Sequence, residues 1–164
     1  MIRELVFYRI CTNNNMKRIF TIALVLMSAL MTKAQNPVSW AFTAKKTGDK
    51  TYEVHITATI QAGWHVYSQE QPEDAIAIPT GIKLNNNPLL TLNGKIKEVG
   101  TMEKFHDAKL DISAHQYSGK VDFVQVVNLK AKAKTNITGS VEFQTCNDEK
   151  CLPAKTVNFS VAIQ

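Results

Sequence analysis

The stretch from Lys50 to Gln61 alternates between apolar and polar side chains at every position. One face carries Tyr52, Val54, Ile56, Ala58 and Ile60, and the other carries Glu53, His55, Thr57, Thr59 and Gln61. A period of two with one apolar face predicts a strand that is buried on one side. Shorter segments with strand composition are Val38–Ala44, Trp64–Ser68, Gly81–Leu84, Leu110–Ala114, Val121–Leu129, Ile137–Cys146 and Thr156–Ile163. The sequence shows no long stretch with a helical period and no internal repeat.

Turn-forming residues separate these segments. They are Thr47-Gly48-Asp49, Ala62-Gly63, Asn85-Asn86-Asn87-Pro88, Asn93-Gly94 and Ser118-Gly119. Many short strands joined by turns predict an all-β fold, an immunoglobulin-like antiparallel β-sandwich in a single domain. A closed barrel is the alternative. We expect one hairpin over Leu110–Leu129, turning at Ser118-Gly119, and another over Ile137–Ile163, turning at Asn147–Lys150.

The first 34 residues have the layout of an N-terminal extension followed by a secretory signal peptide. Lys17 and Arg18 precede the apolar run Ile19–Met31, and small residues before Gln35 predict cleavage near Ala34/Gln35. The run is short for a membrane span, which needs about 20 apolar residues. An anchor or a buried helix is the alternative. Because Met16 is the better start, residues 1–15 suggest an over-extended gene start or a longer basic region.

The charge of the chain belongs mostly to this leader. The whole sequence has 19 Lys+Arg, 14 Asp+Glu and a formal charge of +5. The leader holds five of the basic residues and one acidic residue, namely Arg3, Arg9, Lys17, Arg18, Lys33 and Glu4. Residues 35–164 are therefore close to neutral, which removes the main support for a nucleic-acid partner. We expect a periplasmic or secreted domain with no stable membrane span after cleavage.

Two cysteines remain after the leader, which contains Cys11. Cys146 and Cys151 flank the polar connection Asn147–Lys150, which suits a hairpin loop. Opposed strand residues have Cα atoms about 4.5–5.5 Å apart, a separation that a disulfide tolerates. Since so short a loop gains only about 2 kcal/mol from closure, a reactive disulfide is one interpretation and a small structural disulfide the other. No histidine lies near the two cysteines in sequence to complete the usual zinc motif, so we expect no metal and no cofactor.

Strand phase predicts how the two cysteines face. If Phe143 points inward, strict alternation turns Cys146 outward. Counting back along the return strand turns Cys151 inward, although the two must face one side to bond. Pro153 can resolve the conflict, because proline in sheets is confined to edges and bulges. We therefore expect an irregular backbone over Cys151–Ala154.

Two segments together resemble a known family. The run Phe143-Gln-Thr-Cys-Asn-Asp-Glu-Lys-Cys-Leu-Pro153 is similar to the cysteine hairpin of the N-terminal periplasmic domain of the thiol:disulfide interchange protein DsbD. The segment Ala62-Gly-Trp-His-Val-Tyr-Ser68 is similar to a Gly-aromatic-X-X-Tyr segment of that family. The resemblance covers nearly all of residues 38–164, in the same order.

The resemblance implies a thiol–disulfide interchange component, a protein-disulfide reductase, that carries electrons through Cys146–Cys151. Its partners would be a thioredoxin-like domain or a membrane electron-transfer protein in trans, and oxidised periplasmic thiol proteins. By position, Cys151 would form the mixed disulfides and Cys146 would resolve them. The residues expected to flank the site are Trp64, His65, Tyr67, Phe105 and Pro153. Phe105 is the nearest aromatic for a loop, roughly Lys97–Phe105, that would cover the disulfide.

The sequence also departs from the family. Full-length members continue into a membrane domain and a thioredoxin-like domain, whereas this sequence stops at Gln164. We expect a separate module that acts with a partner in trans, or a truncated reading frame. The rival class is a non-redox exported immunoglobulin-like binding module whose hairpin disulfide only braces the fold.

Overall fold

The computed structural model describes residues 36–164, and every regular element in that part of the chain is a strand. The expected extension and signal peptide, residues 1–34, lie outside the described residues. Between residues 36 and 164 no helix is long and apolar enough to cross a membrane. The strands are β1 (Val38–Lys46), β2 (Thr51–Ile60), β3 (His65–Tyr67), β4 (Gly81–Leu84), β5 (Leu90–Asp107), β6 (Ile112–Leu129), β7 (Thr135–Phe143), β8 (Thr145–Cys146) and β9 (Lys155–Ile163).

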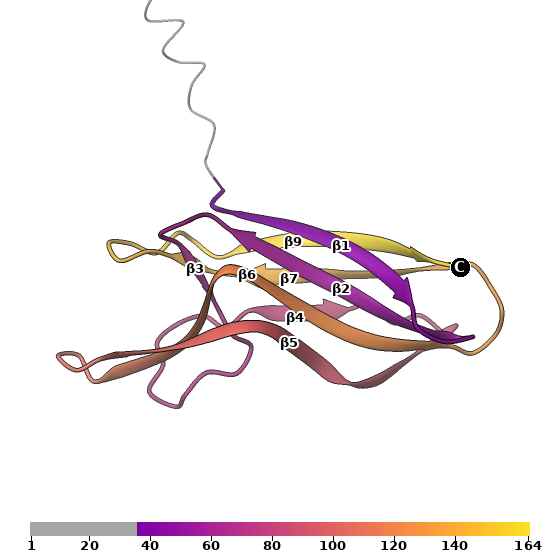
Figure 1. Cartoon of the computed structure of the whole chain (residues 1–164), viewed down its shortest axis with the longest axis horizontal. Helices are drawn as coiled ribbons and strands as arrows, with labels where there is room; N and C mark the ends of the chain where they lie inside the picture. Colours follow the sequence, from indigo (N-terminus) through magenta and orange to yellow (C-terminus); the bar gives the residue numbers. More distant parts are fainter. Residues whose placement is uncertain (1–35) are drawn as a thin grey trace, which may run out of the picture. The chain divides into compact units, whose positions relative to one another are not determined.

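The strands form two antiparallel sheets. The larger sheet has the order β1-β2-β6-β3-β8, with β5 also paired to β6, and the smaller has the order β4-β7-β9. Figure 1 shows β1, β2 and β6 in one layer and β9, β7 and β4 in the layer behind them. The all-β immunoglobulin-like sandwich predicted from the strand pattern is confirmed.

The alternating residues supply the core between the sheets. All five apolar residues of the β2 pattern are buried, and the inward residues of β7 and β9 meet them from the other sheet. Aromatic rings join the layers: Trp40 lies edge-on to Phe143 with ring centroids 5.1 Å apart, and Phe42 stacks on Phe159 at 4.7 Å. The period of two in the sequence therefore corresponds directly to the buried face of the larger sheet.

The predicted hairpin over Leu110–Leu129 is wrong. β6 runs without interruption from Ile112 to Leu129, and its hairpin partner is β5, which the strand pattern did not predict. Gly119 has a φ of 69° and lies where β6 passes from pairing with β2 to pairing with β3. A residue with positive φ inside a strand produces a bulge here rather than a chain reversal.

A turn is predicted at Asn93-Gly94, but in the structure these two residues form a second bulge. The register between β5 and β6 shifts between Asn93 and Lys97, and Gly94 has a φ of 73°. The side-chain amide of Gln125 on β6 donates to the carbonyl oxygens of Asn93 and Gly94, both at 3.3 Å. The expected covering loop, Lys97–Phe105, consequently lies within β5 as paired strand.

Candidate functional site

The two cysteines lie on a short hairpin at one end of the sandwich. The backbone N–H of Asn147 donates to the carbonyl of Lys150 at 2.9 Å, which closes the turn. The side-chain oxygen of Asn147 accepts from the N–H groups of Glu149 at 3.1 Å and Lys150 at 2.8 Å. This is the Asx type of turn, in which asparagine bonds to the backbone two residues on. The turn predicted at Asn147–Lys150 is confirmed.

A disulfide joins Cys146 to Cys151, with the Cα atoms 4.0 Å apart. The pair bridges the hairpin, and the N–H of Leu152 donates to the carbonyl of Thr145 at 2.9 Å just beyond it. The chain then leaves regular strand until β9 begins at Lys155. The irregular backbone expected after Cys151 is therefore present, and Pro153 lies within it on the surface.

The exposure of the cysteines is opposite to the phase prediction. Cys146 is only 1% exposed, whereas Cys151 is exposed. The alternation breaks after Phe143, because the chain leaves β7 of the smaller sheet and joins the larger sheet as β8. There Cys146 pairs with His65, and it packs against Tyr67 and Ala114 in a small cluster apart from the main core. Only Cys151 of the pair is presented to a molecule arriving from solvent.

A hollow of about 600 Å³ opens over the disulfide. Its lining comes from four separate segments: strand β3, the loop before β4, the β5–β6 hairpin and the cysteine turn. Its apolar side chains include Ile76, Phe105 and Leu110, which are 79%, 47% and 67% exposed. Apolar side chains left in solvent around a concave surface are typical of binding sites.

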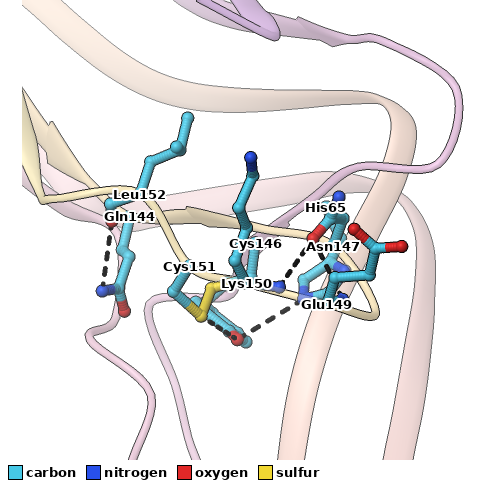
Figure 2. Close-up of a disulfide and its surroundings, with 9 residues drawn as sticks. His65, Gln144, Cys146, Asn147, Glu149, Lys150, Cys151 and Leu152 are labelled. Atoms are coloured by element: carbon cyan, nitrogen blue, oxygen red, sulfur yellow. Dashed lines mark hydrogen bonds between the residues drawn. A yellow bond between two sulfur atoms is a disulfide. The ribbon is translucent and has the colours of Figure 1, made fainter.

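A histidine–tyrosine pair reaches the disulfide from β3. The Nε2 atom of His65 lies 3.4 Å from the Tyr67 hydroxyl, which lies 4.0 Å from the sulfur of Cys151 (Figure 2). Burial lowers the pKa of His65 and raises the pKa of Tyr67. Burial disfavours the charged form of each group, so both are neutral near pH 7. The tyrosine hydroxyl therefore keeps a proton that it can donate to the sulfur.

The loop that carries Ile76 is fixed at both ends. At its start, the carboxylate of Glu98 accepts from the Ser68 hydroxyl, the Gln69 N–H and the Tyr117 hydroxyl, each at 2.7 Å. At its end, the hydroxyl of Thr80 donates to the carbonyl of Tyr67. Burial and the neighbouring carboxylate raise the pKa of Tyr117, which keeps it a donor. These bonds hold the loop beside the strand that supplies Tyr67.

The structure brings together most of the residues predicted to flank the site. His65, Tyr67 and Phe105 line the hollow, whereas Trp64 packs against the main core and does not line it. The sequence reasoning missed Ile76 and Ala114; an isoleucine inside a polar loop was the available signal for the first. Within residues 36–164 no group of His, Cys, Asp and Glu side chains is arranged to hold a metal ion.

Comparison with known proteins identifies the family to which the chain belongs. A family model described as "Thiol:disulfide interchange protein DsbD, N-terminal" matches residues 33–163. No curated protein matches the sequence. The reduced N-terminal domain of DsbD from Neisseria meningitidis is a similar solved structure, with 15% identity and a TM-score of 0.51 over 82% of this chain and 92% of that one. The N-terminal periplasmic domain of ScsB from Proteus mirabilis has 16% identity and a TM-score of 0.48 over 81% of this chain and 49% of that one.

Proposed function

Because this chain belongs to the family of DsbD N-terminal domains, we propose that it carries electrons through a reversible Cys146–Cys151 disulfide. The donor is a thioredoxin-like protein or domain, and the recipients are oxidised exported thiol proteins. Family membership and the disulfide fit thiol–disulfide exchange. The observation that carries the proposal is the pairing of an exposed Cys151 with a buried Cys146 beneath an apolar hollow.

Reduction of the domain begins at the exposed sulfur. A donor thiolate attacks Cys151, the bond to Cys146 breaks, and Cys146 leaves as a thiolate that takes up a proton. The second donor thiol then loses its proton and attacks the donor sulfur of the mixed disulfide. Cys151 leaves as a thiolate and is protonated in turn. Two electrons and two protons pass from the donor dithiol to the domain, and the donor becomes a disulfide.

Reduction of a recipient runs the same steps in reverse. The Cys151 thiolate attacks the recipient's disulfide, and one recipient sulfur leaves as a thiolate and is protonated. Cys146 then loses its proton and attacks Cys151; the bond from Cys151 to the recipient breaks, the second recipient sulfur leaves as a thiolate and is protonated, and the internal disulfide is restored. The Tyr67 hydroxyl lies 4.0 Å from the Cys151 sulfur. A hydrogen bond to a thiolate favours the charged, nucleophilic form. We assign Tyr67 the role of positioning and stabilising that thiolate.

The same proposal includes the cellular location. Thiol–disulfide exchange with exported proteins requires an oxidising compartment, where disulfides form and persist. The signal peptide expected, after an N-terminal extension, within residues 1–34 would deliver the domain to the periplasm. We also propose that His65, Phe105 and Pro153 flank the reactive disulfide, and that Trp64, which packs against the main core, does the same.

Trapping tests the proposal. The Cys146→Ser variant lacks the resolving thiol, so we expect it to accumulate a mixed disulfide through Cys151 with a thioredoxin-like protein from a periplasmic extract. The Cys151→Ser variant is the matched control. Its remaining thiol belongs to the buried Cys146, so it should trap little. Recovery of no mixed disulfide with either variant would favour a non-redox binding module with a structural disulfide.

A further inference from the structure

The disulfide end of the domain is strongly acidic. Three segments gather there, the loop 70–79, the β5–β6 hairpin 103–111 and the cysteine turn 147–151. Their carboxylates are Glu70, Glu73, Asp74, Glu103, Asp107, Asp111, Asp148 and Glu149, and their lysines are Lys104, Lys109 and Lys150. Asp148, Glu149 and Lys150 of the cysteine turn line the hollow itself. The segments around the disulfide thus carry eight carboxylates against three lysines.

The opposite end of the sandwich is basic. The turns 45–50 and 130–134 lie together at the end away from the cysteine hairpin (Figure 1). They hold six lysines, all exposed, against one carboxylate: Lys45, Lys46, Lys50, Lys130, Lys132 and Lys134, with Asp49. The net charge of residues 35–164 is close to zero, but the positive and negative charges are separated along the long axis of the sandwich. Such a separation orients an approaching charged protein before contact.

From this distribution we propose that the apolar hollow over the disulfide is a docking surface for proteins that surround their own reactive cysteine with basic residues. The inference rests on the proposed function and specifies the chemistry of the partner. Ile76, Phe105 and Leu110 supply apolar contact at the centre, and the carboxylates around them supply selection by charge. Charged rims act mainly on association rate and on the exclusion of wrong partners.

The reacting groups make the charge requirement stronger. A partner attacks as a thiolate, and the turn next to Cys151 holds Asp148 and Glu149 against Lys150, a net negative charge. An isolated anion is repelled there, whereas one accompanied by lysine or arginine is attracted. Basic neighbours also lower the pKa of the partner's own cysteine, which increases its thiolate fraction. The same positive charges would thus both activate the partner and guide it to the disulfide end.

Two synthetic peptides test this proposal. Each has a single cysteine between phenylalanines; one is flanked by lysines and the other by glutamates. The protein is the Cys146→Ser variant with Cys151 joined to thionitrobenzoate. The peptide thiolate attacks the Cys151 sulfur, the mixed bond breaks, and the coloured thionitrobenzoate anion leaves. Rates are divided by the thiolate concentration of each peptide, so that only the approach is compared.

We expect the basic peptide to react about tenfold faster than the acidic one at low ionic strength, and the ratio to fall toward one in about 0.5 M salt. In the same background, Asp148→Asn with Glu149→Gln should reduce the ratio at least twofold. The matched control, Asp49→Asn with Glu53→Gln, changes the net charge equally near the opposite end and should leave the ratio unchanged.

Each other outcome overturns the proposal in a distinguishable way. Equal rates for the two peptides, or equal effects of the two double variants, would refute the basic-partner surface and leave the redox function standing. Failure of both peptides to displace thionitrobenzoate would mean that Cys151 is inaccessible. That result would refute the proposed function and the docking surface together.

Discussion

Opening the disulfide should weaken the domain only slightly. Cys146 and Cys151 close a loop of six residues, for which the chain-entropy relation gives about 2 kcal/mol at 25 °C. The main core lies elsewhere: Cys146 belongs to a separate small cluster with Tyr67, Ala114 and Ala77. Hydrogen bonds from Asn147 to Lys150 and from Leu152 to Thr145 remain to hold the hairpin after reduction. Because domains of this size are stable by about 5–15 kcal/mol, the reduced form should stay folded.

Urea unfolding of residues 35–164, with and without a reducing agent, measures this difference directly. We expect a cooperative transition in both states, an unchanged m-value and a loss of about 2 kcal/mol on reduction. The double variant Cys146→Ala/Cys151→Ala should match the reduced protein and be insensitive to the reducing agent. A loss above about 4 kcal/mol, or the disappearance of the transition, would show that the disulfide is a structural brace and would refute the reasoning.

Three further changes have defined outcomes. Gly139→Ala places a Cβ atom 2.8 Å from the Phe159 ring and even closer to a backbone carbonyl, so urea unfolding should show a loss of about 2–3 kcal/mol. His65 has a pKa below its usual 6.5, so the unfolded chain binds the proton more readily and stability falls as the pH drops below about 6.5. His65→Gln should flatten that part of the stability–pH curve. Tyr67→Phe, in the reduced Cys146→Ser background, should slow alkylation of Cys151 about threefold at neutral pH, because the thiolate loses its hydrogen-bond donor.

Matched variants separate these effects from general damage. Gly81→Ala, where an added Cβ meets nothing within 4 Å, should be nearly neutral; a loss as large as at Gly139 would contradict the steric account. The histidine explanation fails if His65→Gln leaves the wild-type pH slope unchanged. Tyr52→Phe removes a hydroxyl bonded to the carbonyl of Gln164, away from the hollow, and should leave alkylation unchanged; slowing equal to that of Tyr67→Phe would argue against a direct role for Tyr67.

Hydrophobic alternation predicted the strands that build the core and failed for β5. Strand β2 buries every second residue, so the period of two is visible in the sequence. Strand β5 is mostly exposed on both faces, and its stability comes from backbone pairing with β6. A strand without a buried face carries no apolar period to detect. Gly94 and Gly119 both adopt the positive φ that glycine favours, but a positive φ occurs in bulges as well as in turns, so the sequence did not distinguish the two.

The site was predictable in its chemistry and less so in its geometry. The cysteine spacing and the turn residues correctly indicated a disulfide across Asn147–Lys150. The burial of Cys146 was not predictable, because it depends on a change of sheet between β7 and β8 that local alternation does not contain. Ile76 lines the hollow on a loop whose start is bonded to Glu98, and these hydrogen bonds join segments distant in sequence.

The reduction potential of Cys146–Cys151 tests the central claim most directly. It is measured by equilibrating residues 35–164 with glutathione redox buffers and quantifying the oxidised fraction after acid quenching and thiol labelling. A disulfide that exchanges electrons in function should have a potential above about −300 mV, in the range of thiol–disulfide exchange proteins. A potential below about −300 mV would identify a structural disulfide that the exchange pool does not reduce, and it would contradict the proposed electron-carrying role.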